Sequence, residues 1–124
     1  MPERAAAAAS LYRRLGGHEP LAAVVDAFSR RLIIDGELAH YFAHLDLEQL
    51  RRHQVAFLDA ALGGPHAYRG ATLRQAHRGL GITARDFRLC LEPLAAALRA
   101  CDVPEELGAE VLGKITALRG ELVE

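Results

Sequence analysis

Glycine-rich breaks divide an otherwise helix-favouring sequence into short segments. They lie at Gly16–Gly17, Asp35–Gly36, Gly63–Gly64–Pro65 and Gly79–Leu80–Gly81. Glycine ends a helix readily because it adopts the left-handed backbone conformation that the residue after a helix often needs. The whole chain has 124 residues, a length typical of one domain with one hydrophobic core. We therefore expect a single all-α domain built from short helices.

Composition agrees with a helical domain and excludes several kinds of partner. Hydrophobic residues make up 51% of the chain and aromatic residues only 6%, and the alanine and leucine that dominate them favour helices over strands. The net charge is −1 and the arginines are scattered, which indicates no nucleic-acid partner. No stretch resembles a signal peptide or a membrane span, so we expect a cytoplasmic protein without a membrane partner.

Apolar residues spaced by three and four positions predict the main helices. Asp46 and Gln49 form a capping-box pattern, and Thr83 and Asp86 form a second one. Pro93 is expected to kink its helix because it cannot donate a backbone hydrogen bond. Residues 1–9 are expected to be a disordered or frayed tail before a domain of residues 10–124. The predicted helices cover residues 10–15, 19–34, 37–44, 46–62, 83–100 and 104–122.

Two cysteines fall in one of these predicted helices. Cys90 and Cys101 are eleven positions apart, and eleven helical residues span about 16 Å, which is too far for a disulfide. No CxxC motif accompanies them, so zinc or redox chemistry is not indicated. Both are expected to act as small buried hydrophobic residues.

His77 is the candidate for metal chemistry. It lies at the end of a predicted helical stretch and is followed by Gly79 and Gly81. A neutral imidazole in apolar surroundings is what an axial ligand of haem iron requires. The alternative is an ordinary core or surface histidine, and the residues alone leave both interpretations open. The apolar neighbours of His77 are Leu73, Leu80, Ile82 and Phe87.

The predicted helix 46–62 carries a polar residue within its apolar stripe. Gln54 stands where the spacing of Leu50, Phe57 and Leu58 requires an apolar side chain. A buried glutamine is costly unless it finds hydrogen-bond partners. Gln54 therefore either pairs with a neighbouring side chain or faces a polar group in a pocket. His53 lies at the edge of the same face and is either solvated or directed to the same place.

Four motifs in order resemble those of the group I truncated haemoglobins, also called two-over-two globins. They are LYRRLGG, the pair Tyr41–Phe42, HQVAFLDAALGGP and AHRGLGIT. The resemblance runs from about residue 10 to the C-terminus. It implies an all-α, two-over-two helical sandwich around haem b (iron protoporphyrin IX).

The resemblance also implies roles for individual residues. His77 matches the proximal ligand of the haem iron, and Tyr68 matches a residue near the haem propionates. The positions that match apolar haem contacts are Phe42, Leu73, Phe87 and Ile115. The positions that match the distal side, where a gas ligand binds, are Leu50, His53, Gln54, Phe57 and Leu58.

Two positions decide how the distal side would work. Ser29 follows Phe28, where this family usually has a tyrosine that hydrogen-bonds the ligand. A serine hydroxyl is shorter and needs a water to bridge the gap, so Gln54 becomes the main ligand-stabilising candidate and Ser29 the weaker one. His53 matches a position that serves as a sixth iron ligand in some members; its alternative is an outward orientation toward a propionate.

Three classes of function follow. The first is reversible binding of oxygen, nitric oxide or carbon monoxide, as in oxygen transport, with nitric oxide dioxygenation if an external reductase supplies electrons. The second is redox or electron transfer by a bis-histidyl, six-coordinate haem. The third is a haem-free helical interaction module. The chain has no GxGxxG, HExxH or Ser-His-Asp pattern, so a built-in reductase or a conventional hydrolase is not indicated. The oligomeric state stays open.

Overall fold

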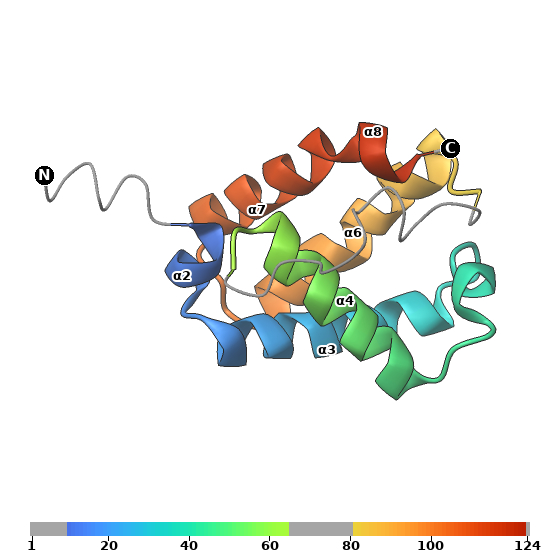
Figure 1. Ribbon diagram of the computed structural model, residues 1–124, viewed down its shortest axis with the longest axis horizontal. Helices are drawn as coiled ribbons and strands as arrows, with labels where there is room; N and C mark the ends of the chain where they lie inside the picture. Colours follow the sequence, from blue (N-terminus) through green and yellow to red (C-terminus); the bar gives the residue numbers. More distant parts are fainter. Residues whose placement is uncertain (1–9, 65–80, 124) are drawn as a thin grey trace, which may run out of the picture.

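All of the elements in the described part of the chain are helices (Figure 1). The structure, a computed structural model, describes residues 10–64 and 81–123. None of the helices in these two ranges is long and apolar enough to cross a membrane. The all-α prediction is therefore confirmed. The elements are α2 (Leu11–Leu15), α3 (His18–Ile34), the 3₁₀ helix η1 (Ala39–Phe42), α4 (Leu47–Ala61), α6 (Ala84–Ala100), α7 (Glu105–Ala117) and α8 (Arg119–Leu122).

The two predicted capping boxes differ in outcome. At the start of α4, Asp46 accepts the Gln49 backbone N–H at 2.8 Å, and the Gln49 side chain accepts the Asp46 N–H at 3.0 Å. At the start of α6, the Thr83 hydroxyl accepts the Asp86 N–H at 3.0 Å. The Asp86 carboxylate accepts instead from the hydroxyl of Tyr41. The first box is confirmed, and only the Thr83 half of the second is formed.

The last predicted helix is divided in two. The sequence pattern predicted one helix over residues 104–122, but α7 ends at Ala117 and α8 begins at Arg119. The Leu118 N–H donates to the carbonyl of Ile115 at 3.0 Å, a three-residue step that tightens the last turn and interrupts the α-helical ladder. Elsewhere α6 continues through Pro93, whose side chain is buried.

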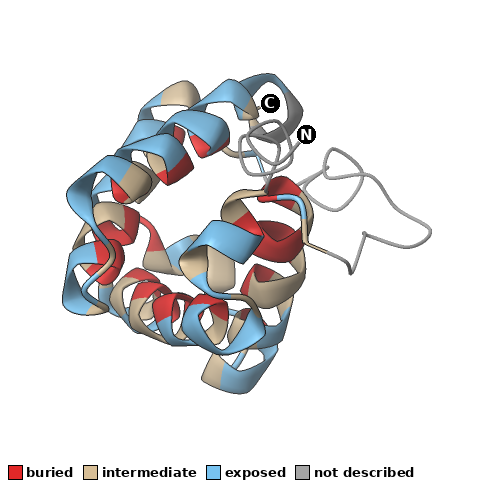
Figure 2. Ribbon diagram, turned by 90° about the vertical axis from the view of Figure 1, so that its left-hand side faces the viewer, coloured by how far each residue is buried: buried red, intermediate tan, exposed pale blue. Residues whose placement is uncertain are grey.

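The core forms where α3 packs against both α4 and α6, and where α6 in turn packs against α7. Figure 2 shows buried positions on the faces that the helices turn toward one another. Leucine is the most frequent residue of this core, and three polar side chains, Ser29, Gln54 and Asp59, are buried with it. The largest fully buried apolar residues are Leu21, Leu32, Leu38, Leu50, Leu58 and Leu94.

The break after α4 brings this helix close to α2. The Tyr12 N–H donates to the Leu62 carbonyl at 3.0 Å, and the Gly64 N–H donates to the Asp59 carbonyl at 2.7 Å. A Cβ atom on Gly64 would lie 2.6 Å from Asp59 Cγ and 2.8 Å from Tyr12 Cδ2. Glycine is therefore required at position 64 for space, since these contacts are closer than real Cβ atoms allow.

We expect Gly64→Ala to lower the free energy of unfolding by about 1–3 kcal/mol, because the new methyl group overlaps buried atoms. Gly113→Ala is the matched control. Gly113 lies inside α7 with nothing within 4 Å of its Cβ position, so alanine there should stabilise the helix by about 0.5–1 kcal/mol. Urea denaturation of both variants measures the difference. Equal effects at the two sites would contradict the close approach at Gly64.

Candidate functional site

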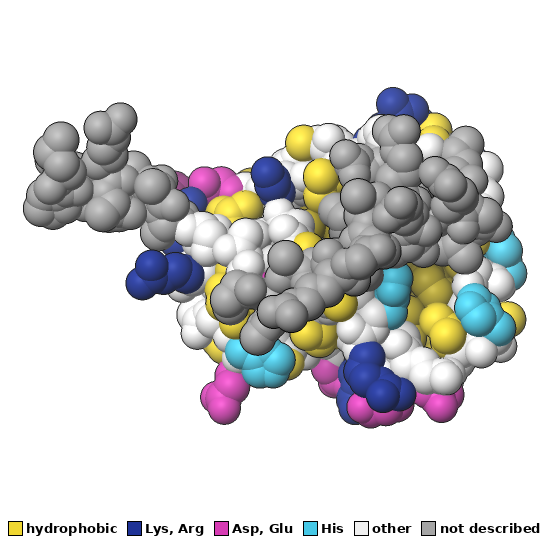
Figure 3. Space-filling view, viewed as in Figure 1, with side chains coloured by type: hydrophobic (Ala, Val, Ile, Leu, Met, Phe, Trp, Pro, Cys, Tyr) yellow, Lys and Arg dark blue, Asp and Glu magenta, His cyan; other side chains and the backbone are white. Residues whose placement is uncertain are grey.

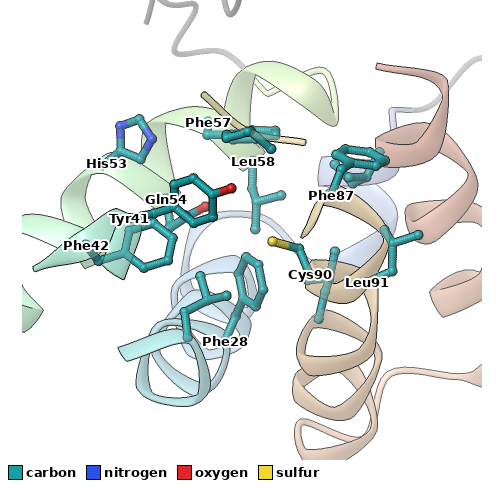
Figure 4. Close-up of a pocket in the computed structure, with 14 residues that line it drawn as sticks. Phe28, Tyr41, Phe42, His53, Gln54, Phe57, Leu58, Phe87, Cys90 and Leu91 are labelled. Carbon is teal, nitrogen blue, oxygen red and sulfur yellow. The ribbon is translucent and has the colours of Figure 1, made fainter. Parts of the chain in front are cut away.

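One largely apolar cavity lies among α3, η1, α4, α6 and α7 (Figure 4). About 730 Å³ of space that no protein atom occupies lies between its walls, including open solvent at its mouth. On the face shown in Figure 3, hydrophobic side chains lie beside histidines at the η1 end of the molecule. The cavity is lined by Phe28, Leu32, Tyr41, Phe42, His53, Gln54, Phe57, Leu58, Ile82, Phe87, Cys90, Leu91, Leu94 and Ile115.

Helical spacing explains why these side chains meet. Gln54, Phe57 and Leu58 are three and four positions apart on α4, so they share one face. Phe28 and Leu32 are one turn apart on α3, and the α6 residues follow the same spacing. In Figure 4 the α4 and η1 side chains stand opposite those of α6. The apolar stripes of these helices, continued past the core, thus form the walls of the cavity.

The structure brings together most of the site residues that the sequence singled out. Leu50 and Ser29 have no exposed surface and are not among the lining residues. Tyr68, Leu73 and His77 lie outside the described residues. The candidates that line the cavity are Phe42, His53, Gln54, Phe57, Leu58, Phe87 and Ile115.

Gln54 and Ser29 are the polar side chains of interest near this cavity. Gln54 is 6% exposed, and its Oε1 atom has no hydrogen-bond partner among the described residues. The buried Ser29 Oγ atom likewise has none. A buried polar atom without a partner costs free energy, which a water molecule that hydrogen-bonds to it can recover. Of these two residues, only Gln54 lines the cavity. Gln54 rather than Ser29 can therefore contact a ligand there.

Sequence reasoning did not assign several of the lining residues to the site. Phe28 and Leu32 were on the predicted apolar face of residues 19–34, and Ile82 was a neighbour of His77; these patterns could have indicated them. The α6 positions could have been found from the three- and four-residue spacing that follows Phe87. The residues without a predicted site role are Phe28, Leu32, Tyr41, Ile82, Cys90, Leu91 and Leu94.

Tyr41 has a partner far away in the sequence. Its hydroxyl donates to Asp86 Oδ2 at 2.5 Å, 45 positions along the chain. Burial, and then the hydrogen bond to Asp86, raise the pKa of Tyr41 above its usual value. Its ring lines the cavity. The side chain therefore forms part of the cavity wall and also hydrogen-bonds to α6 through its hydroxyl.

Cys90 contributes a thiol to the apolar wall of α6. Burial, reinforced by the negative charges of Asp86 and Asp35, raises the pKa of Cys90 to about 12. The thiol therefore stays protonated at neutral pH and acts as a small hydrophobic group, although Cys90 and Cys101 are both only partly buried, not fully buried as expected. No disulfide joins it to Cys101, since both cysteines are free.

We expect Cys90 in the folded protein to react with iodoacetamide far more slowly than in the unfolded chain at pH 8. The raised pKa leaves little thiolate, which is the reactive form, so the rate should climb as the pH approaches about 12. Cys101→Ala leaves Cys90 as the single thiol, and mass spectrometry follows its alkylation. Rapid alkylation of the folded variant at pH 8 would contradict the buried position.

Comparisons with known proteins agree with this fold and cavity. The family model described as bacterial-like globin matches residues 10–124. A group 1 truncated hemoglobin of Mycolicibacterium paratuberculosis is 45% identical over 119 residues, which cover 96% of this chain and 88% of that protein. The crystal structure of the Fe(III) truncated hemoglobin of Tetrahymena pyriformis has a TM-score of 0.82 and 29% identity, covering 93% of this chain and 98% of that one.

A second similar structure contains its prosthetic group. It is the 2/2 hemoglobin of a Synechococcus species, in the cyanomet state with covalently attached heme, at a TM-score of 0.81 and 27% identity. It covers 93% of this chain and 98% of that one. The chain belongs to the bacterial-like globin family, among the group I truncated haemoglobins. The two-over-two fold expected from the sequence is thereby confirmed, and membership of the family implies a haem cofactor and the binding of diatomic gases.

Proposed function

We propose that this protein binds haem b in the cavity and reversibly binds oxygen, nitric oxide or carbon monoxide there. The proposal depends on Gln54, a buried side chain whose amide can donate a hydrogen bond, in the wall of an otherwise almost apolar cavity. Sites for small molecules are typically lined by apolar side chains, with a few polar groups that orient the ligand.

The lining residues fit a flat, largely apolar macrocycle. Phe42, Phe57 and Phe87 offer aromatic surface from η1, α4 and α6, and the sequence supplies His77 as the candidate axial ligand. When bound, haem would supply the iron that takes up the gas and changes oxidation state. The chain would supply the neutral imidazole of His77, the apolar cage that excludes water, and one distal amide.

Gln54 would select and retain the gas. A bound gas with partial negative charge accepts a hydrogen bond from the Gln54 amide NH₂, and burial strengthens that bond because little water competes. One such charge-assisted bond contributes about 1.5–3 kcal/mol. Gln54 would therefore slow the release of oxygen more than that of a less polar gas such as carbon monoxide.

We expect Gln54→Leu to speed oxygen dissociation about ten- to hundredfold, since it removes this hydrogen bond, while carbon monoxide dissociation changes little. Ser29→Ala is the control, because Ser29 is buried but is not in the cavity wall; its rate should stay within about twofold of the unchanged protein. Stopped-flow replacement of oxygen by carbon monoxide measures the rates. A larger effect at Ser29 than at Gln54 would overturn this assignment.

Nitric oxide dioxygenation is the enzymatic form of the same proposal. One nitric oxide and one oxygen molecule give nitrate only with one added electron per turnover. The sequence carries no flavin or nicotinamide motif such as GxGxxG, so an external reductase is part of this proposal.

A second candidate function is favoured by the position of His53. This residue lines the cavity from α4, directly before Gln54, and Ser29 replaces the tyrosine usual in the family. His53 would then be a second axial ligand of the iron, together with His77, in a six-coordinate protein suited to electron transfer. Gases would have to displace His53, which lowers their apparent affinity by the fraction of protein with an open site. The alternative role of His53 is a contact with a haem propionate.

We expect His53→Ala to change the ferric spectrum from low-spin to high-spin, because it removes the sixth ligand. Carbon monoxide should then bind faster, because no histidine has to dissociate from the iron before the gas can bind. His44→Ala is the matched control, since His44 is exposed and outside the cavity wall. A ferric spectrum and a binding rate unchanged in His53→Ala would contradict the role of His53 as an axial ligand.

A further inference from the structure

Two long-range contacts join the η1 region to the first turn of α6. The Tyr41 hydroxyl donates to Asp86 Oδ2 at 2.5 Å, and Arg85 forms an ion pair with Glu37 Oε2 at 2.9 Å. Their partners are 45 and 48 positions apart in sequence. Both contacts thus fix how η1 sits against the start of α6.

The two contacts differ in strength because they differ in exposure. The Arg85 and Glu37 side chains are 62% and 53% exposed, and such a surface pair contributes little. The Asp86 side chain is only 14% exposed, and Tyr41 is half-buried with its ring in the cavity wall. A hydrogen bond to a shielded carboxylate is charge-assisted and costly to break. The Tyr41–Asp86 bond is therefore the main link.

The acceptor itself is held in place. The Asp86 N–H donates to the Thr83 hydroxyl at 3.0 Å at the start of α6, so the Asp86 backbone is fixed by the helix cap. Phe42 and Phe87, the next residue after Tyr41 and after Asp86, both line the cavity. Figure 4 shows Tyr41 and Phe42 on one side of the cavity and Phe87 on the other. The hydroxyl therefore links two opposite aromatic walls.

We propose that Tyr41 is a positioning residue that fixes the width of the haem slot by tying the η1 wall to α6 through Asp86. This inference rests on the proposed binding of haem in the cavity. Without the hydroxyl, η1 and Phe42 separate more easily from α6 and Phe87. The haem slot would then open more often, and haem would dissociate faster.

The test is the rate at which haem passes from the loaded protein to an excess of a haem-free globin acceptor. Tyr41→Phe keeps the ring and removes the hydroxyl, and the rate should rise about three- to tenfold. Asp86→Ala should give a similar increase, although Asp86 also pairs with Arg85 at 3.6 Å. The double variant should show less than the sum of the two single effects, since both substitutions remove the Tyr41–Asp86 bond. Asp86→Asn keeps an acceptor oxygen but loses the charge that strengthens the bond, so it should restore part of the slow rate.

Tyr12→Phe is the matched control, because it also removes one tyrosine hydroxyl but Tyr12, on α2, is outside the cavity wall. Its haem-loss rate should equal that of the unchanged protein. A purely structural role of Tyr41 would give additive effects of Tyr41→Phe and Asp86→Ala and no rescue by Asp86→Asn, and that result would overturn the inference. An unchanged rate in Tyr41→Phe would overturn it as well, while the haem proposal stands. Failure of the unchanged protein to take up haem would overturn both.

Discussion

The structure depends on the packing of α3 against two other helices at once. Because α3 contacts both α4 and α6, its buried face holds these helices at the spacing that leaves a cavity between them. Leu21 and Val24 bury the first half of α3 in the core, and Phe28 and Leu32 reach the cavity from the second half. The same apolar stripe thus stabilises the fold and lines the site, as burial of one helix face requires.

The cavity is consequently rich in aromatic and aliphatic surface and poor in polar groups. Each polar group in the cavity wall therefore has a large effect on ligand binding. In a site with little water, hydrogen bonds are stronger, and a polar group without a partner costs more free energy. Gln54 and His53 are adjacent on α4, so gas retention and competition for the iron would be decided by neighbouring side chains. Tyr41 differs from both, since its hydroxyl is directed to α6 and acts through the position of the wall.

The sequence predicts those features that depend on neighbouring residues. The Asp46–Gln49 cap and the apolar faces of α4 and α6 were predictable because they follow from spacing within one helix. The division of the last helix at Leu118 was not, because hydrogen-bond geometry at that turn overrides a continuous apolar pattern. The contact of Tyr41 with Asp86 depends on how η1 docks on α6, and that is set only by the tertiary fold. Ser29, the weaker ligand-stabilising candidate, is buried and is not among the residues that line the cavity.

Titration of the haem-free protein with haemin, followed by visible absorption spectroscopy, tests directly whether the cavity binds haem through His77. We expect saturable uptake of one haem per chain with an intense Soret band, and a strongly weakened complex in His77→Ala. Uptake that does not saturate, or a complex equally tight in His77→Ala, would contradict a haem site with His77 as its axial ligand.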